Sequence, residues 1–386
     1  MEIRVEGAGG GRRRLRVIAA RMGGASDDMP KNIVLCLDGT ANQLKAKGNT
    51  NVVRLYELLD LSDPDVQVAY YDPGVGTFGA KGAVTPIARW FTKILGLAFG
   101  YGLRTNLAEA YTYLMQTYRP DDRVFLFGFS RGAYTARALC GMTHRAGLLR
   151  PGAENLVPYA VNVYARSKRE WDEGDWVQID KFARVFSVEA GRGRSLPVHF
   201  VGIWDSVKAA GILRWNLKWP YTRQLSNVAT VRHAVSIDEN RRPYREYLVQ
   251  AREEGPNTRE VWFAGTHSDV GGSFEDDRRL GDITLQWMAE HAVASGLIVD
   301  RTALAEARAV SLDHALGKRH RAGWSWALLT YRRRPITPEN ALVHQSVRVR
   351  MRQMPAYTPR LPAEPQWDES AWPPTGPQAE QPLPPQ

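Results

Sequence analysis

The sequence predicts an α/β domain built on a doubly wound, mainly parallel sheet. Short runs that are apolar at nearly every position recur along the chain, as expected for strands that are covered on both faces in a parallel sheet. Helical patterns separate most of these runs, and repeated alternation of strand and helix is typical of an α/β fold. Several runs end in a polar residue, and ligands of such sheets bind beyond the carboxyl ends of the strands. A site is therefore expected at that edge.

Five apolar runs are predicted to be strands, because each is bounded by glycine, proline or a polar residue. They are residues 32–40, 66–74, 123–130, 198–206 and 260–268. Five segments with a helical pattern lie between or after them. They are residues 51–61, 102–118, 131–149, 227–238 and 283–296.

Three segments depart from this alternation. Residues 148–196 form a longer, charged helical stretch that is predicted to be a cap inserted over the sheet. Residues 1–30 are rich in glycine and arginine, which predicts a flexible basic leader. Residues 357–386 are rich in proline, which predicts a disordered tail. The structured domain is thus expected to span residues 31–356.

The composition restricts the compartment and the partners. The chain has 51 Lys and Arg residues against 41 Asp and Glu, a formal net charge of +10 that favours anionic partners. Cys36 and Cys140 lie inside apolar runs, which does not suggest a disulfide framework or a zinc site. The N-terminus lacks the apolar region of a signal peptide, and the longest apolar stretch, residues 90–103, is shorter than the roughly 20 residues of a membrane-spanning helix. We expect a cytoplasmic protein, and secretion without a cleavable signal is compatible with this.

The stretch from Gly128 to Gly132 matches the pattern G-x-S-x-G, with Ser130 at its centre. A predicted strand precedes it and a predicted helix follows, which is the context in which such a serine projects its hydroxyl into the crevice. A serine hydroxyl needs a base to take its proton and a third group to orient that base. Ser130 is therefore a candidate nucleophile only if such partners exist.

Asp205 and His267 are the predicted partners. Each lies at the carboxyl end of a predicted strand, and they follow Ser130 in the order Ser, Asp, His that is found in α/β hydrolases. The intervals are long enough for a helical crossover between strands. The backbone amides of Arg131 and of Gly39, in the loop after the first strand, are the predicted donors to an oxyanion.

No cofactor or metal is predicted, although one metal-binding alternative stays open. Carboxylate and imidazole groups near the strand ends could hold a divalent ion, but their spacing matches no strong metal signature. These residues are Asp38, His267, Asp269, Asp276 and Asp277.

With these motifs, the sequence resembles a family of α/β hydrolases, catalogued as a domain of unknown function, that includes the catalytic domains of type VI secretion phospholipase effectors. The matching segments include "LCLDGTANQ", "YYDPGVGT", "GFSRGAYTAR", "GIWDSV" and "VWFAGTHSDVGG". The resemblance implies an α/β-hydrolase fold, hydrolysis of lipid esters, and a catalytic triad that falls on Ser130, Asp205 and His267.

The hypothesis from the sequence is therefore a serine esterase or phospholipase that acts through an acyl-enzyme. Its expected partners are a lipid or small ester substrate and, peripherally, an anionic membrane, with no nucleic acid. The alternative is a metal-using or non-catalytic α/β module whose basic surface binds anionic lipid or nucleic acid.

Overall fold

The structure is a computed structural model of the chain. It describes residues 29–39, 47–74, 98–165, 171–190, 193–207, 219–250, 255–321, 331–337, 339, 341–368, 370 and 372–373. Nearly all of the predicted leader, residues 1–28, lies outside the described residues, as do most of the loop after the first strand, residues 40–46, and the apolar residues 90–97.

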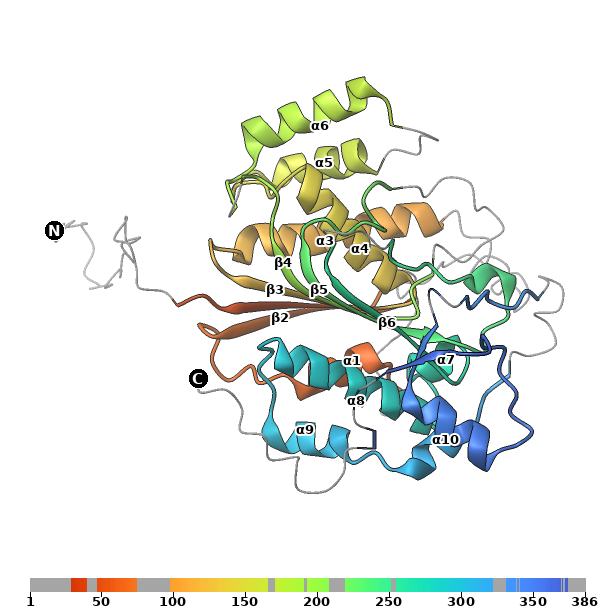
Figure 1. Cartoon of the computed structure of the whole chain (residues 1–386). Helices are drawn as coiled ribbons and strands as arrows, with labels where there is room; N and C mark the ends of the chain where they lie inside the picture. The colour runs from red at the N-terminus through yellow and green to blue at the C-terminus, as the bar shows by residue number, and fades with distance from the viewer. Residues whose placement is uncertain are drawn as a thin grey trace, which may run out of the picture.

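The described residues form one sheet of eight strands in the order β2-β1-β3-β4-β5-β6-β7-β8 (Figure 1). Every neighbouring pair is parallel. This confirms the predicted fold class. The strands are β1 Asn32–Leu37, β2 Gln67–Asp72, β3 Arg123–Phe129, β4 Val198–Trp204, β5 Val228–Ser236, β6 Asn257–Phe263, β7 Leu342–Val343 and β8 Gln366–Trp367.

Helices cover both faces of the sheet (Figure 1). On one face lie α3 (Ala98–Thr117) and α4 (Arg131–Arg145), with α5 (Val157–Tyr164) and α6 (Glu173–Phe186) on their outer side. On the other face lie α1 (Asn51–Leu58), α8 (Arg279–Ala294), α9 (Arg301–Arg308) and α10 (Gln345–Gln353). The short helices are α7 (His267–Val270) and the 3₁₀ helices η1 (Glu154–Leu156), η2 (Arg242–Tyr244) and η3 (Leu312–Leu316). None of the described helices is long and apolar enough to cross a membrane.

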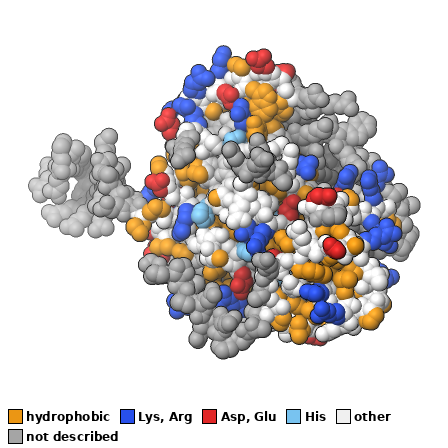
Figure 2. All heavy atoms as spheres, viewed as in Figure 1, with side chains coloured by type: hydrophobic (Ala, Val, Ile, Leu, Met, Phe, Trp, Pro, Cys, Tyr) orange, Lys and Arg blue, Asp and Glu red, His pale blue; other side chains and the backbone are white. Residues whose placement is uncertain are grey.

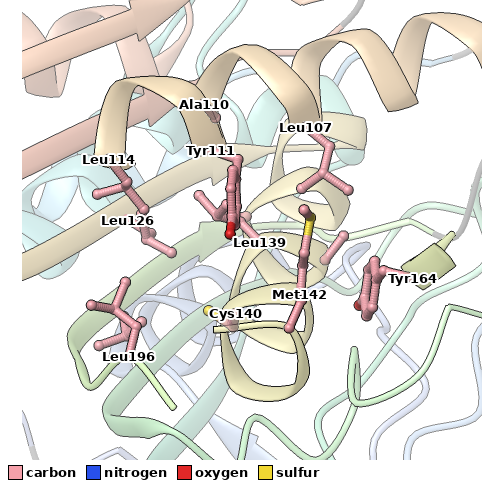
Figure 3. Packing of buried hydrophobic residues seen from close by; sticks show 14 of the residues in the cluster. Leu107, Ala110, Tyr111, Leu114, Leu126, Leu139, Cys140, Met142, Tyr164 and Leu196 are labelled. Carbon is pink, nitrogen blue, oxygen red and sulfur yellow. The ribbon is translucent and has the colours of Figure 1, made fainter. Parts of the chain in front are cut away.

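The central strands explain why both faces need cover. Successive side chains of a strand point to opposite faces, and in β1 Ile33 and Leu35 join the core under α3 and α4, whereas Val34 and Cys36 join the core under α1 and α8. All of β1 is buried. Figure 3 shows how the first core fills the space between helices and sheet, with side chains from α3 and α4 packed over Leu126 of β3.

Two predictions about elements are wrong. Residues 227–238 were expected to be helical, but Val228–Ser236 is strand β5, between β4 and β6. Its valines and threonine are β-branched and suit a strand that neighbours cover on both sides. The predicted tail is also ordered in part, because Gln366–Trp367 pairs with β7 and the following Asp368 is buried.

The predicted cap segment, residues 148–196, contains η1, α5 and α6. Helix α5 packs against α3 and α4, and α6 packs against α4 and α5. The segment thus forms a second helical layer over one face of the sheet (Figure 1). Its role as a cap stays a prediction.

Candidate active site

Ser130 lies in the turn between β3 and α4, in a backbone conformation that few residues adopt. Its φ is 59° and its ψ is −116°, a region that costs energy for a residue with a Cβ and is found at functional turns. The Ser130 amide donates to the carbonyl of Trp204 at the end of β4, with an N···O distance of 3.1 Å. The residue is 7% exposed. The turn therefore holds the hydroxyl at the carboxyl edge of the sheet.

The two glycines of the motif are required by close packing. A Cβ on Gly132 would lie 2.0 Å from the carbonyl oxygen of Leu37 in β1, and one on Gly128 would lie 2.7 Å from the amide nitrogen of Ala133. Neither contact is sterically allowed, and both involve backbone that cannot move aside cheaply. The first turn of α4 thus packs directly on β1, and the sharp turn at Ser130 depends on it.

The structure brings the three predicted side chains into one hydrogen-bonded chain. Nε2 of His267 lies 2.9 Å from Oγ of Ser130, and Nδ1 of His267 lies 2.6 Å from Oδ2 of Asp205. Asp205 follows β4, which neighbours β3, and His267 follows β6, two strands further along the sheet. Parallel strands end at the same edge, so residues far apart in the chain meet there.

Burial and nearby charges set the protonation states of His267 and Asp205. Burial lowers the pKa of His267, against the opposing effect of Asp205. Burial alone would raise the pKa of Asp205, but the positive charge of Arg334 and the hydrogen bond from His267 outweigh it and hold that pKa below its usual range. The geometry thus combines a neutral imidazole with an ionised carboxylate, the arrangement in which Nδ1 donates to Asp205 and Nε2 accepts from Ser130.

Aromatic rings pack beside the imidazole of His267, and a carboxylate holds its backbone. The ring of Phe129 lies 4.6 Å from that of His267, centroid to centroid, and the ring of Tyr244 lies at 4.8 Å. The backbone amide of His267 donates to Oε2 of Glu239 at 3.2 Å. With both ring nitrogens also bonded, the imidazole has little freedom to turn away from Ser130.

The two predicted oxyanion donors differ in their surroundings. Arg131 is the first residue of α4, and the first amides of a helix have no partner within the helix. The amide of Gly39 donates to Oδ1 of Asp38 at 2.6 Å. Asp38 is itself held by the hydroxyls of Thr50 and Tyr71. Gly39 can therefore serve an oxyanion only if its bond to Asp38 opens.

The candidate metal ligands do not converge. No group of three or more His, Cys, Asp or Glu side chains suited to a metal ion occurs within the part of the chain that the structure describes. Asp269 instead accepts from Nδ1 of His320 at 2.6 Å, and Asp277 forms an ion pair with Arg279. Asp276 accepts from Nε2 of His320 at 3.0 Å.

Arg334 is a residue of this site that the sequence analysis missed. Its Nη1 lies 2.5 Å from Oδ1 of Asp205 and its Nη2 lies 2.9 Å from Oδ2. In the sequence it belongs to the basic run 332–334, which is typical of a solvated surface. Only the fold, which returns residues 331–337 to the edge of the sheet, distinguishes Arg334 from the other arginines of this run.

The surface beside this edge is basic. Figure 2 shows Lys and Arg side chains gathered at the right-hand edge of the molecule, the side on which the strands end in Figure 1. A pocket of about 430 Å³ lies next to Thr266 and Ser268, which flank His267 in the chain. Its lining includes Arg321, Arg333 and Arg360, and also Arg319 and Arg334, which are paired with Asp238 and Asp205.

A family model and a curated relative place this fold among known proteins. The model described as "T6SS, Phospholipase effector Tle1-like, catalytic domain" matches residues 31–291, more than half of the chain. Uncharacterized protein YEL023C of Saccharomyces cerevisiae is 37% identical over 221 residues, which are 56% of this chain and 32% of that protein. The chain thus spans about a third of the length of this relative.

Two solved structures show a more distant similarity. The crystal structure of an uncharacterized protein from Pseudomonas aeruginosa aligns with a TM-score of 0.41 and 19% identity, over 76% of this chain and 50% of that one. The structure of the Tle1 effector bound to the VgrG spike of the type 6 secretion system aligns with a TM-score of 0.37 and 16% identity, over 66% of this chain and 56% of that one.

Proposed function

Because the chain belongs to the family of Tle1-like phospholipase effectors of the type VI secretion system, which it matches through their catalytic domain, we propose that it is a serine hydrolase that cleaves carboxylic esters of lipids. The observation that carries this proposal is the continuous hydrogen-bonded chain from the hydroxyl of Ser130 through His267 to Asp205. A serine activated in this way attacks acyl groups.

In the first half of the reaction, Oγ of Ser130 attacks the ester carbonyl carbon while its proton passes to Nε2 of His267. Asp205 stabilises the imidazolium that results, since it is ionised and accepts from Nδ1. The amide of Arg131 donates to the oxyanion of the tetrahedral intermediate, and the N-terminus of α4 favours the negative charge. Gly39 is the second donor once its amide leaves Oδ1 of Asp38. When the intermediate collapses, the alkoxide leaves with the proton from His267, and an acyl-enzyme remains.

In the second half, a water molecule attacks the acyl carbon of the acyl-enzyme. His267 takes a proton from this water and returns it to Oγ of Ser130 as the second intermediate collapses. The carboxylic acid is released, and the enzyme regains its starting protonation. No metal or cofactor is needed for either half.

The proposed substrate is an ester at a lipid surface. The net charge of +10 and the arginines beside the site favour approach to an anionic bilayer, by attraction that salt screens over about 8–10 Å. Binding to anionic vesicles is therefore expected to weaken as ionic strength rises. The rate of hydrolysis of a small neutral ester is expected to stay the same.

The test compares Ser130→Ala with the intact protein on short p-nitrophenyl esters and on phospholipid vesicles. Loss of the nucleophile is expected to lower kcat by roughly 10⁴-fold or more. Ser187→Ala is the matched control, because Ser187 is also buried but its hydroxyl donates to the backbone carbonyl of Ala146. Equal turnover by Ser130→Ala and the intact protein would refute the serine mechanism, and activity abolished by a chelator would favour the metal-using alternative.

A further inference from the structure

Arg334 binds both oxygens of the Asp205 carboxylate from a segment beyond residues 31–291, the stretch that the family model matches. The same guanidinium donates to two carbonyls, that of Ser236 at 3.0 Å through Nη1 and that of Tyr244 at 2.6 Å through Nη2. Its side chain is 2% exposed. Such a fork is rigid, because four hydrogen bonds fix its plane and position.

Among the described residues, Arg334 is the only Lys or Arg side chain that forms an ion pair with Asp205. Its Oδ1 accepts from Arg334 and from the amide of Ser236 at 2.9 Å. Its Oδ2 accepts from both His267 and Arg334. The carboxylate oxygen that orients the imidazole is therefore the one that the guanidinium shares.

On the basis of the proposed ester hydrolysis, we propose that Arg334 is a positioning residue, which holds the carboxylate of Asp205 in line with His267 and offsets part of its negative charge. Since an imidazolium is stabilised by the net charge of the carboxylate beside it, this offset keeps His267 less basic. His267 then stays neutral, and able to accept the Ser130 proton, at lower pH than it would beside an uncompensated Asp205.

Other charged groups also face this pair and are part of the balance. Glu239 accepts from the amide of His267 and is itself paired with Arg241. Glu246 lies 3.9 Å from Nε of Arg334. On α7, Asp269 is bound to His320. Glu239 and Asp269 each have a partner of their own at 2.6 Å, and Glu246 is paired with Arg245 at 3.6 Å. Because Arg334 binds both oxygens of Asp205 directly, it is the charge whose removal changes the field at Asp205 most.

The test measures kcat and kcat/KM across pH on a soluble ester, for Arg334→Met and Arg334→Lys. With Arg334→Met we expect kcat to fall by about 10-fold to 100-fold and the acidic limb of kcat/KM to move up by about one pH unit. Arg334→Lys keeps the charge but not the fork. Arg334→Lys should bring the acidic limb of kcat/KM close to that of the intact protein while kcat stays lowered. A merely structural role of Arg334 would not separate these two quantities.

Arg350→Met is the matched control. Arg350 is also buried and donates to two carbonyls, those of Ala315 and Gly317, but it does not contact Asp205. Its loss should lower thermal stability and leave kcat and the pH profile per folded molecule unchanged.

The outcomes separate this proposal from the hydrolysis on which it rests. If Ser130→Ala is inactive and Arg334→Met folds with the wild-type kcat and pH profile, the role of Arg334 is refuted and the serine mechanism stands. If Ser130→Ala is fully active, the mechanism itself fails. Should Arg334→Met not fold, Arg334→Lys decides, because a wild-type kcat without the fork would overturn the positioning role.

Discussion

Replacing Asp205 with asparagine gives the sharpest test of the hydrogen-bond arrangement in the site. Two donors face Oδ1, the guanidinium of Arg334 and the amide of Ser236. The side-chain oxygen of asparagine must stay there to accept from them, so its NH₂ group takes the place of Oδ2 and points at Nδ1 of His267. Nδ1 must then accept rather than donate, which places the imidazole proton on Nε2, toward Ser130.

Two effects of this change can be given magnitudes. A histidine in the wrong tautomer cannot take the serine proton, which in a triad lowers kcat by about 10⁴-fold. The substitution also leaves Arg334 buried without a full counter-charge, and breaking a buried ion pair from one side costs about 3–5 kcal/mol. The bonds from Nη1 of Arg334 and from the amide of Ser236 are kept, but the bond from Nη2 of Arg334 to Oδ2 is lost and two donors then face each other. The expected loss in the free energy of unfolding is therefore about 3–5 kcal/mol.

The assay is kcat on a soluble ester, normalised to folded protein, together with urea unfolding. Asp368→Asn is the matched control, because Asp368 is as buried as Asp205 and also binds an arginine, Arg259. The control should lose stability and keep its kcat. If folded Asp205→Asn retained kcat within 10-fold of the intact protein, the orienting role of Asp205 would be refuted.

Three further predictions follow from the geometry. The acidic limb of kcat/KM should lie below pH 6.5, the ordinary pKa of histidine, because burial lowers the pKa of His267 and the base works only when neutral. A pH series on a neutral ester measures the limb, and a limb above pH 6.5 would contradict this expectation. Gly132→Ala should lower the melting temperature sharply or prevent folding, since its Cβ would meet the carbonyl of Leu37 at 2.0 Å. Circular dichroism on heating tests this, with Gly174→Ala as comparison, because a Cβ there would meet a side-chain oxygen of Asp172 at 3.2 Å and no backbone. A chain that ends at residue 356 should melt at lower temperature than the full chain, because it lacks strand β8 and the bond from Tyr357 to Asp238; an unchanged melting temperature would show that the tail adds nothing.

The carboxyl edge of the sheet was the most predictable part of this molecule. Apolar runs mark strands that are buried on both faces, and parallel strands end at one edge. Ser130, Asp205 and His267 could therefore be expected to meet from their positions alone, and the structure brings them together.

What the sequence analysis missed depends on packing between distant segments. Strand β5 reads like a helix because its buried apolar residues recur three or four positions apart, at Val228, Val231 and Val235, with polar residues between them, a pattern that fits either period. Trp367 and Asp368 lie in a proline-rich stretch but find partners in β7 and the buried Trp287. Arg334 is 129 residues from Asp205, and no local pattern reveals such a pair.

The place of Arg334 in the chain also bears on the order of events during synthesis. Ser130, Asp205 and His267 are all translated before it, together with strands β1 to β6. A nascent chain can contain Ser130, Asp205 and His267 while Asp205 still lacks the cation that fixes it. The same holds for a chain that proteolysis cuts before residue 334. Full hydrolytic competence is therefore expected to arise late, when the segment that carries Arg334 docks against the sheet. For an enzyme whose proposed substrate is membrane lipid, the timing of that docking decides when a newly made molecule becomes active.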